Sequence, residues 1–160
     1  MTHQTTTPME VLLRITKEEV WETKYEPDSG ILHLYPIFIP DRKRKCSASV
    51  QWFPKSNRLM SGASLHYSTN PSELQMHRAS MVINMDYWPC NCYWNQQKQT
   101  MSLKYGFDVL NGYISDEDAH KVLTLPYMSL TGTIELFDEY AKADCKNIDI
   151  LDALSTDVSM

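Results

Sequence analysis

The chain has 160 residues, of which 42% are hydrophobic, and a formal net charge of −5. This length suits one domain with its own core, and this composition excludes the intrinsically disordered class. Residues 1–80 hold ten Lys and Arg against eight Asp and Glu, whereas residues 81–160 hold five against twelve. The asymmetry predicts that the basic face of one copy docks on the acidic face of another copy or on an anionic surface. The alternative is a solvated surface whose charge is merely uneven.

Targeting signals are not evident in the sequence. No apolar run approaches the roughly 18 residues that span a bilayer. The first residues, MTHQTTTPME, lack both a basic region and an apolar region, so we expect no signal peptide. These observations favour a protein of the cytosol or nucleus.

The first half of the chain reads mainly as strands. Strands are predicted over residues 9–15, 31–39, 46–53 and 59–67 from their β-branched and aromatic content. Pro36 within the second segment favours an edge position, because proline cannot donate a ladder hydrogen bond. Between these segments, EPDSG (26–30) and PKSN (54–57) are typical of turns.

The clearest helix is predicted between Asn70 as N-cap and Pro89 as terminator. Pro71 in the first turn and Glu73 after it strengthen the prediction. We expect the apolar residues of this helix to form a buried stripe, which consists of Leu74, Met81, Val82 and Met85.

Three further elements complete the prediction. A strand is expected over 100–107, a short helix after the N-cap Ser115, and an alternating strand over 129–138. The fold class is therefore α+β: a single domain with a mostly antiparallel sheet, one long amphipathic helix and one or two short helices. We expect a flexible segment at 1–8, a globular domain at 9–147, and a short helical turn with a frayed tail at 148–160.

The stretch MDYWPCNCYWNQQ (85–97) raises the question of a metal or redox site. Cys90 and Cys92 are separated by one residue, whereas zinc and redox motifs separate their cysteines by two. No second ligand pair is evident near Cys46 or Cys145. We therefore expect buried thiols within an aromatic wall, with no metal and no cofactor.

Catalytic motifs are not found either. The five glycines are dispersed, and no nucleotide-binding loop, nucleophile elbow or zinc-protease motif occurs. His120, close to Asp118, is a conceivable general base, but on a short amphipathic helix it reads better as a polar-face residue. We predict that the protein is not an enzyme and has no small-molecule substrate; a small hydrolase that uses His120 is the remote alternative.

One dense cation run is a candidate for recognition. Arg42, Lys43, Arg44 and Lys45 are consecutive, and such a run contacts phosphates, lies on an anionic membrane or is only a solvated loop. With Lys55 and Arg58 nearby in sequence, we predict a contact for an anionic membrane surface or a nucleic acid.

Two short motifs resemble those of a known family. SNR (56–58) before an amphipathic helix and GTIEL (132–136) as a late strand are similar to motifs of rhabdovirus matrix proteins, and the size resembles that of plant-infecting members. The resemblance implies a structural protein of the virion and host cytoplasm, with the nucleus as a further location. Its implied partners are other copies of itself, the viral nucleocapsid protein and an anionic membrane. The alternative is a cytosolic or nuclear adaptor that binds a protein or nucleic acid, with interference in host defence as one role.

Overall fold

A helix opens the described part of the chain, where the sequence favoured a strand. The computed structural model describes residues 6–35, 46–86 and 90–143. Helix α1 spans Pro8–Glu18, and a capping box joins the N-cap Thr7 to Glu10. The capping box and the proline at its start outweigh the β-branched content of residues 9–15, because they satisfy the free N–H groups of a first helical turn. The predicted strand over 9–15 is therefore wrong.

The described strands form one antiparallel sheet of six strands. Their order across the sheet is β1–β2–β3–β4–β6–β5. Their bounds are Glu22–Glu26 (β1), Ile31–Tyr35 (β2), Cys46–Phe53 (β3), Arg58–His66 (β4), Asn91–Asn95 (β5) and Thr100–Asp108 (β6). Strands β2, β3, β4 and β6 confirm predicted strands, and the sequence reasoning missed β1 and β5.

Both predicted turns connect neighbouring strands. Gly30 has φ +65° and donates its N–H to the carbonyl of Pro27 at 3.3 Å, which closes the β1–β2 hairpin. The short 3-10 helix η1 (Pro54–Ser56) and Asn57 connect β3 to β4. Strand β2 lies between β1 and β3, so the predicted edge position is wrong; Pro36 itself lies outside the described residues.

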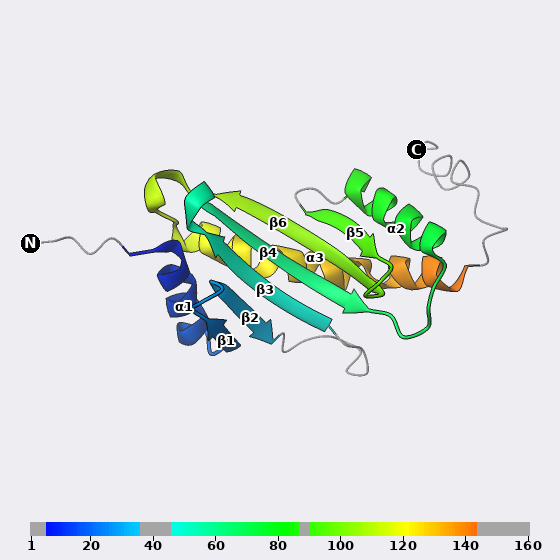
Figure 1. Ribbon diagram of the computed structural model, residues 1–160, viewed down its shortest axis with the longest axis horizontal. Helices are drawn as coiled ribbons and strands as arrows, with labels where there is room; N and C mark the ends of the chain where they lie inside the picture. Colours follow the sequence, from blue (N-terminus) through cyan, green and yellow to red (C-terminus); the bar gives the residue numbers. More distant parts are fainter. Residues whose placement is uncertain (1–5, 36–45, 87–89, 144–160) are drawn as a thin grey trace, which may run out of the picture.

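Helix α3 (Asp116–Lys142) runs along one face of the sheet (Figure 1). Its N-cap is Ser115, as predicted, but it continues through residues 129–138, where a strand was expected. The strand prediction is wrong because Leu130, Thr133 and Phe137 recur at helical spacing and are all buried. Burying them against the sheet outweighs the local β-branched preference.

The sheet has one covered and one uncovered face. Along β4, Leu59, Ala63 and Leu65 are fully buried on the side of α3, whereas Met60 and Ser64 lie on the other side. Helices α1 and α2 (Glu73–Asp86) lie near opposite ends of α3 (Figure 1). Short polar side chains occupy the middle of the uncovered face, where the hydroxyls of Ser64 and Ser102 are 2.6 Å apart.

The α+β class, the single domain and the largely antiparallel sheet are thus confirmed. Helix α1 begins at Pro8, within the segment 1–8 that was predicted to be flexible; the predicted tail 148–160 lies outside the described residues. Among the helices that the structure describes, none is both long enough and apolar enough to cross a bilayer.

Candidate functional site

Helix α2 has apolar residues on two sides. Of the four residues that were expected in the core, Leu74, Met81 and Met85 are exposed, and Val82 is partly buried against the core. The buried residues are instead Gln75, Met76, Ala79, Ser80 and Ile83. Asn70, the predicted N-cap, has φ +50°, and the helix begins three residues later at Glu73. The existence of the helix is confirmed, whereas its N-cap and its buried face are corrected.

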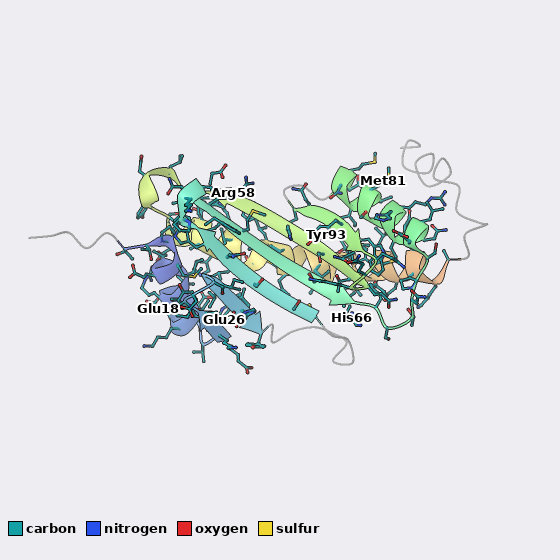
Figure 2. The ribbon with its side chains drawn as sticks, viewed as in Figure 1. Glu18, Glu26, Arg58, His66, Met81 and Tyr93 are labelled. Carbon is teal, nitrogen blue, oxygen red and sulfur yellow. The ribbon has the colours of Figure 1, made fainter. Side chains whose placement is uncertain are left out.

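Three of the exposed large apolar side chains on the described α-helices form one stripe of α2. Leu74, Met81 and Met85 are 52%, 60% and 67% exposed. His77 and Arg78 lie on the two sides of this stripe, since they are four and three residues before Met81 and fall about 40° and 60° from it in opposite directions on a helical projection. We call Leu74, His77, Arg78, Met81 and Met85 the α2 outer face. Figure 2 shows Met81 pointing away from the sheet.

Asn84 fixes this helix against edge strand β5. Its side-chain oxygen accepts from the N–H of Cys92 at 2.6 Å, and its amide nitrogen donates to the carbonyl of Cys92 at 2.8 Å. One amide thus occupies both backbone groups of Cys92 on the outer side of the sheet. These two hydrogen bonds hold α2 against β5, so the outer face of the helix has a fixed position relative to the sheet.

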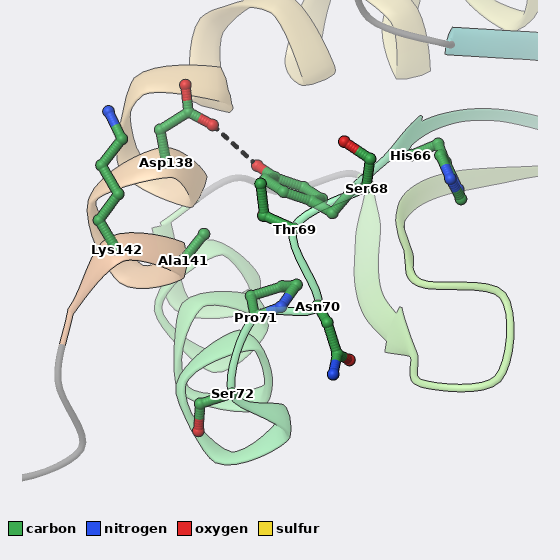
Figure 3. A pocket seen from close by; sticks show the side chains of 10 residues that line it. His66, Ser68, Thr69, Asn70, Pro71, Ser72, Asp138, Ala141 and Lys142 are labelled. Atoms are coloured by element: carbon green, nitrogen blue, oxygen red, sulfur yellow. Dashed lines mark hydrogen bonds between the residues drawn. The ribbon is translucent and has the colours of Figure 1, made fainter.

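A cleft of about 430 Å³ lies beside the start of α2 (Figure 3). Pro71 and Ser72 line it from the α2 side, and Asp138 and Lys142 from the end of α3. The hydroxyl of Tyr67 donates to Asp138 at 3.1 Å, which connects the loop after β4 to α3. The ring of Tyr67 also meets Trp94 edge-to-face, with centroids 5.9 Å apart.

These contacts were not found from the sequence. Nothing in the local pattern marks Asn84 as the partner of the Cys92 backbone or Tyr67 as the partner of Asp138. The spacings of 8 and 71 residues belong to no helix or turn pattern. Only the aromatic content of the segment 85–97 signalled that Trp94 belongs to a packed layer.

The predicted anion contact is only partly within the described structure. Arg42, Lys43, Arg44 and Lys45 lie outside the described residues. Lys55 is exposed on η1, and the guanidinium of Arg58 is 3.6 Å from the carboxylate of Asp108. Anion binding by the four-cation run, Lys55 and Arg58 therefore stays a prediction.

The cysteines of the aromatic stretch are buried thiols. Cys90 and Cys92 are 3% and 4% exposed. Burial raises the pKa of the Cys92 thiol to about 12, and burial also raises the pKa of Cys90. The described residues contain no group of His, Cys, Asp and Glu side chains close enough to hold a metal ion. A thiol with so high a pKa is a poor nucleophile, because the thiolate is the reactive form.

His120 takes part in a structural contact between helices. Its Nε2 bonds to the carboxylate of Glu19 after α1, and its Nδ1 lies 2.7 Å from the carbonyl of Asp116. Both ring nitrogens are occupied, so the described geometry offers no free base at this residue.

Comparison with known proteins finds likeness in structure alone. No family model matches the chain, and no curated protein sequence matches it. A chain in the crystal structure of the ExsC–ExsE complex is 10% identical, with a TM-score of 0.59 over 90% of this chain and 98% of that one. YbjN from E. coli, described as a putative transcription regulator, is 11% identical, with a TM-score of 0.62 over 82% and 92%. The chain shares their fold.

A third likeness is weaker. A chain of the HopA1–SchA chaperone–effector complex is 11% identical, with a TM-score of 0.45 over 83% of this chain and 91% of that one. This score is too low to establish a shared fold.

The expected assignment to viral matrix proteins is contradicted. Two chains with this fold, one in the ExsC–ExsE complex and YbjN from E. coli, are not described as viral or matrix proteins. The resemblance also depended on GTIEL (132–136) as a strand, and these residues lie within α3. The virion, nucleocapsid and membrane roles that the resemblance implied lose their basis with it.

Proposed function

We propose that the protein is a non-enzymatic adaptor that binds a segment of another protein, and that the α2 outer face is the contact surface. The observation that carries this proposal is the exposure of Leu74, Met81 and Met85 on one stripe of a helix whose opposite side builds the core. Clustered exposed apolar side chains are typical of interaction sites. Methionine suits such a site because its flexible thioether adapts to different partners.

The shared fold supports the same proposal. One chain of similar structure was crystallised as part of a complex between two named components, ExsC and ExsE. A fold that serves in a protein complex is a suitable scaffold for an adaptor, although fold alone does not specify function. The partner proposed for the α2 outer face is a polypeptide segment with its own apolar stripe, because such a segment buries both surfaces.

The absence of enzymatic activity is part of the proposal. Within the described residues, His120 uses both ring nitrogens in structural contacts. Burial raises the pKa of the Cys46, Cys90 and Cys92 thiols, which disfavours the nucleophilic thiolate. Binding rather than chemistry is what the described surface supports.

The proposal is tested by photo-crosslinking from α2 in cells of the source organism. Benzoylphenylalanine replaces Met81 in one variant and Met128 in a matched control, since Met128 on α3 is 62% exposed. We expect one protein to be captured from position 81 and not from 128. The purified partner should then bind the wild type and lose at least about tenfold in affinity with Met81→Asp, since central apolar residues of an interface each contribute more than 1 kcal/mol.

Two results would contradict the adaptor. Equal capture from both positions, or unchanged affinity of Met81→Asp, would show that α2 is not the contact. Capture of only a second copy of this chain would make the α2 outer face a self-association surface, in agreement with the predicted homo-oligomer.

A further inference from the structure

The α2 outer face lies close to the point where the described chain leaves the domain. Ala141 and Lys142, at the end of α3, line the same cleft as Pro71 and Ser72 at the start of α2 (Figure 3). Leu74, the first apolar residue of the outer face, is two residues beyond Ser72. The described end of α3 and the start of the outer face therefore lie on the same side of the domain, at one cleft.

The sequence that follows Ala143 is long enough to cover α2. Residues 144–160 comprise 17 residues, which measure about 25 Å as a helix. The 14 residues of α2 measure about 21 Å on the same basis. Even a partly extended segment can reach from Ala143 along the whole outer face.

The same residues carry a stripe that complements this surface. The apolar residues Ile150, Leu151, Leu154 and Val158 fall within about 100° on a helical projection, which is the pattern of an amphipathic helix. Four Asp and one Lys make residues 144–160 acidic. The exposed stripe of α2 is bordered by Arg78 on one side and by His77 on the other, and the Nε2 of His77 is 3.5 Å from the carboxylate of Glu73. The pairing is therefore favoured by contact between the two apolar stripes.

We propose that residues 144–160 dock on the α2 outer face through Ile150, Leu151, Leu154 and Val158, and compete there with the partner segment. The competition rests on the proposed function, whereas the docking itself does not. Because the segment belongs to the same chain, its effective concentration at α2 is high, and a partner must displace it. The apparent affinity for the partner is proportional to the fraction of molecules in which the face is free, so occupation of the face lowers it.

Methionine oxidation in the full-length protein tests the docking directly. Met81, Met85 and Met128 have similar exposed fractions of 60%, 67% and 62% in the described domain. Dilute hydrogen peroxide converts an accessible methionine to its sulfoxide, and mass spectrometry measures each initial rate. We expect Met81 and Met85 to react severalfold more slowly than Met128, which serves as the internal standard.

Two variants supply the controls. Leu151→Asp with Leu154→Asp should raise the rates at Met81 and Met85 to that of Met128, because an aspartate at each position breaks the apolar contact. Thr156→Asp with Ser159→Asp adds the same charge on the opposite side of the projected helix and should leave the protection unchanged. Protection should be constant over a roughly hundredfold range of protein concentration, because the contact is intramolecular.

Each alternative outcome is distinguishable. Equal rates at all three methionines in the wild type, or protection that survives Leu151→Asp with Leu154→Asp, would overturn the docking. Protection that increases with protein concentration would also overturn it and would identify a second copy as the occupant. Loss of the docking leaves the adaptor intact if the Met81 crosslink and the Met81→Asp affinity loss persist. If both proposals hold, Leu151→Asp with Leu154→Asp should bind the purified partner severalfold more tightly than the wild type.

Discussion

His120 shows how the charge state of one residue follows from its contacts. The carboxylate of Glu19 and the carbonyl of Asp116 are both acceptors, so both ring nitrogens must donate and the imidazole must be protonated. The hydrogen bond to Glu19, and then the bond to the Asp116 carbonyl, raise the pKa of His120. The same hydrogen bond lowers the pKa of Glu19. With Arg14 bonded to Asp116 at 2.5 Å, these residues link α1 to α3.

This contact predicts a pH dependence of stability. The pKa of His120 is raised above its ordinary value of 6.5, so its contribution is complete below 6.5 and is lost as pH rises through the raised pKa. The pKa of Glu19 is lowered from 4.5, so its contribution is complete above 4.5 and is lost as pH falls through the lowered pKa. The contact should therefore stabilise most between 4.5 and 6.5. Thermal melting of the wild type across this range and above it measures the effect.

The comparison variant is His120→Gln, which cannot carry the charge. It should melt at a lower temperature than the wild type in the acidic window, and the difference should shrink as pH rises. Both partners are partly exposed, so the contribution is roughly 1 kcal/mol or less. A constant difference between His120→Gln and the wild type at every pH would contradict the charged contact.

The two buried cysteines provide a second test at the same scale. The thiol of Cys92 lies 3.3 Å from the sulfur of Met101 in the core. Replacing Cys90 and Cys92 by Ser puts two hydroxyls into these sites and should lower the free energy of unfolding by about 1–3 kcal/mol. Binding to the partner should be unchanged, because neither thiol is on the α2 outer face. Denaturant titration measures the loss, and stoichiometric zinc in the wild type that disappears in the variant would contradict a packing role.

At the scale of one element, α2 is a helix with two apolar stripes. Leu74→Asp or Met81→Asp should change the free energy of unfolding by only about 0.5 kcal/mol, because both positions are more than half exposed. The matched variants Met76→Asp and Ile83→Asp make the same change on the fully buried side. They should unfold the domain, because an unpaired charge would lie in the core. Circular dichroism during heating distinguishes the exposed variants from the buried ones. If Leu74→Asp or Met81→Asp unfolded the domain, the outer stripe would belong to the core.

At the scale of the whole molecule, one helix covers the sheet and makes the described structure a single folding unit. Phe137 on α3 is fully buried, and Phe137→Ala should cost about 3–5 kcal/mol. Met128→Ala on the same helix is exposed and should cost about 0.5 kcal/mol or less. We expect one cooperative transition with coincident tryptophan fluorescence and circular dichroism. Separate transitions for the two probes would show that the sheet does not unfold as one unit.

The turns, one helix cap and the fold class were predictable from the sequence, because they depend on neighbouring residues. The β1–β2 turn needs Gly30 at positive φ, the β3–β4 hairpin follows from a break between two strand patterns, and the N-cap of α3 follows from Ser115 and the acids after it. The α+β class followed from the sum of these elements. Each of them is decided within a few residues, so it can be recognised without the rest of the fold.

Tertiary structure alone decided what depends on which surface is buried. Residues 129–138 have a local preference for a strand, yet they lie in α3, because their buried side chains face the sheet at helical spacing. Either apolar stripe of α2 was able to pack inward, and the position of α2 beside β5, held by Asn84, placed Met76 and Ile83 inside and Met81 outside. Hydrophobic burial is non-directional, so the pattern of a single helix does not specify which side meets the core. The candidate site therefore came from the packing of distant elements, and its three main residues had been expected in the interior.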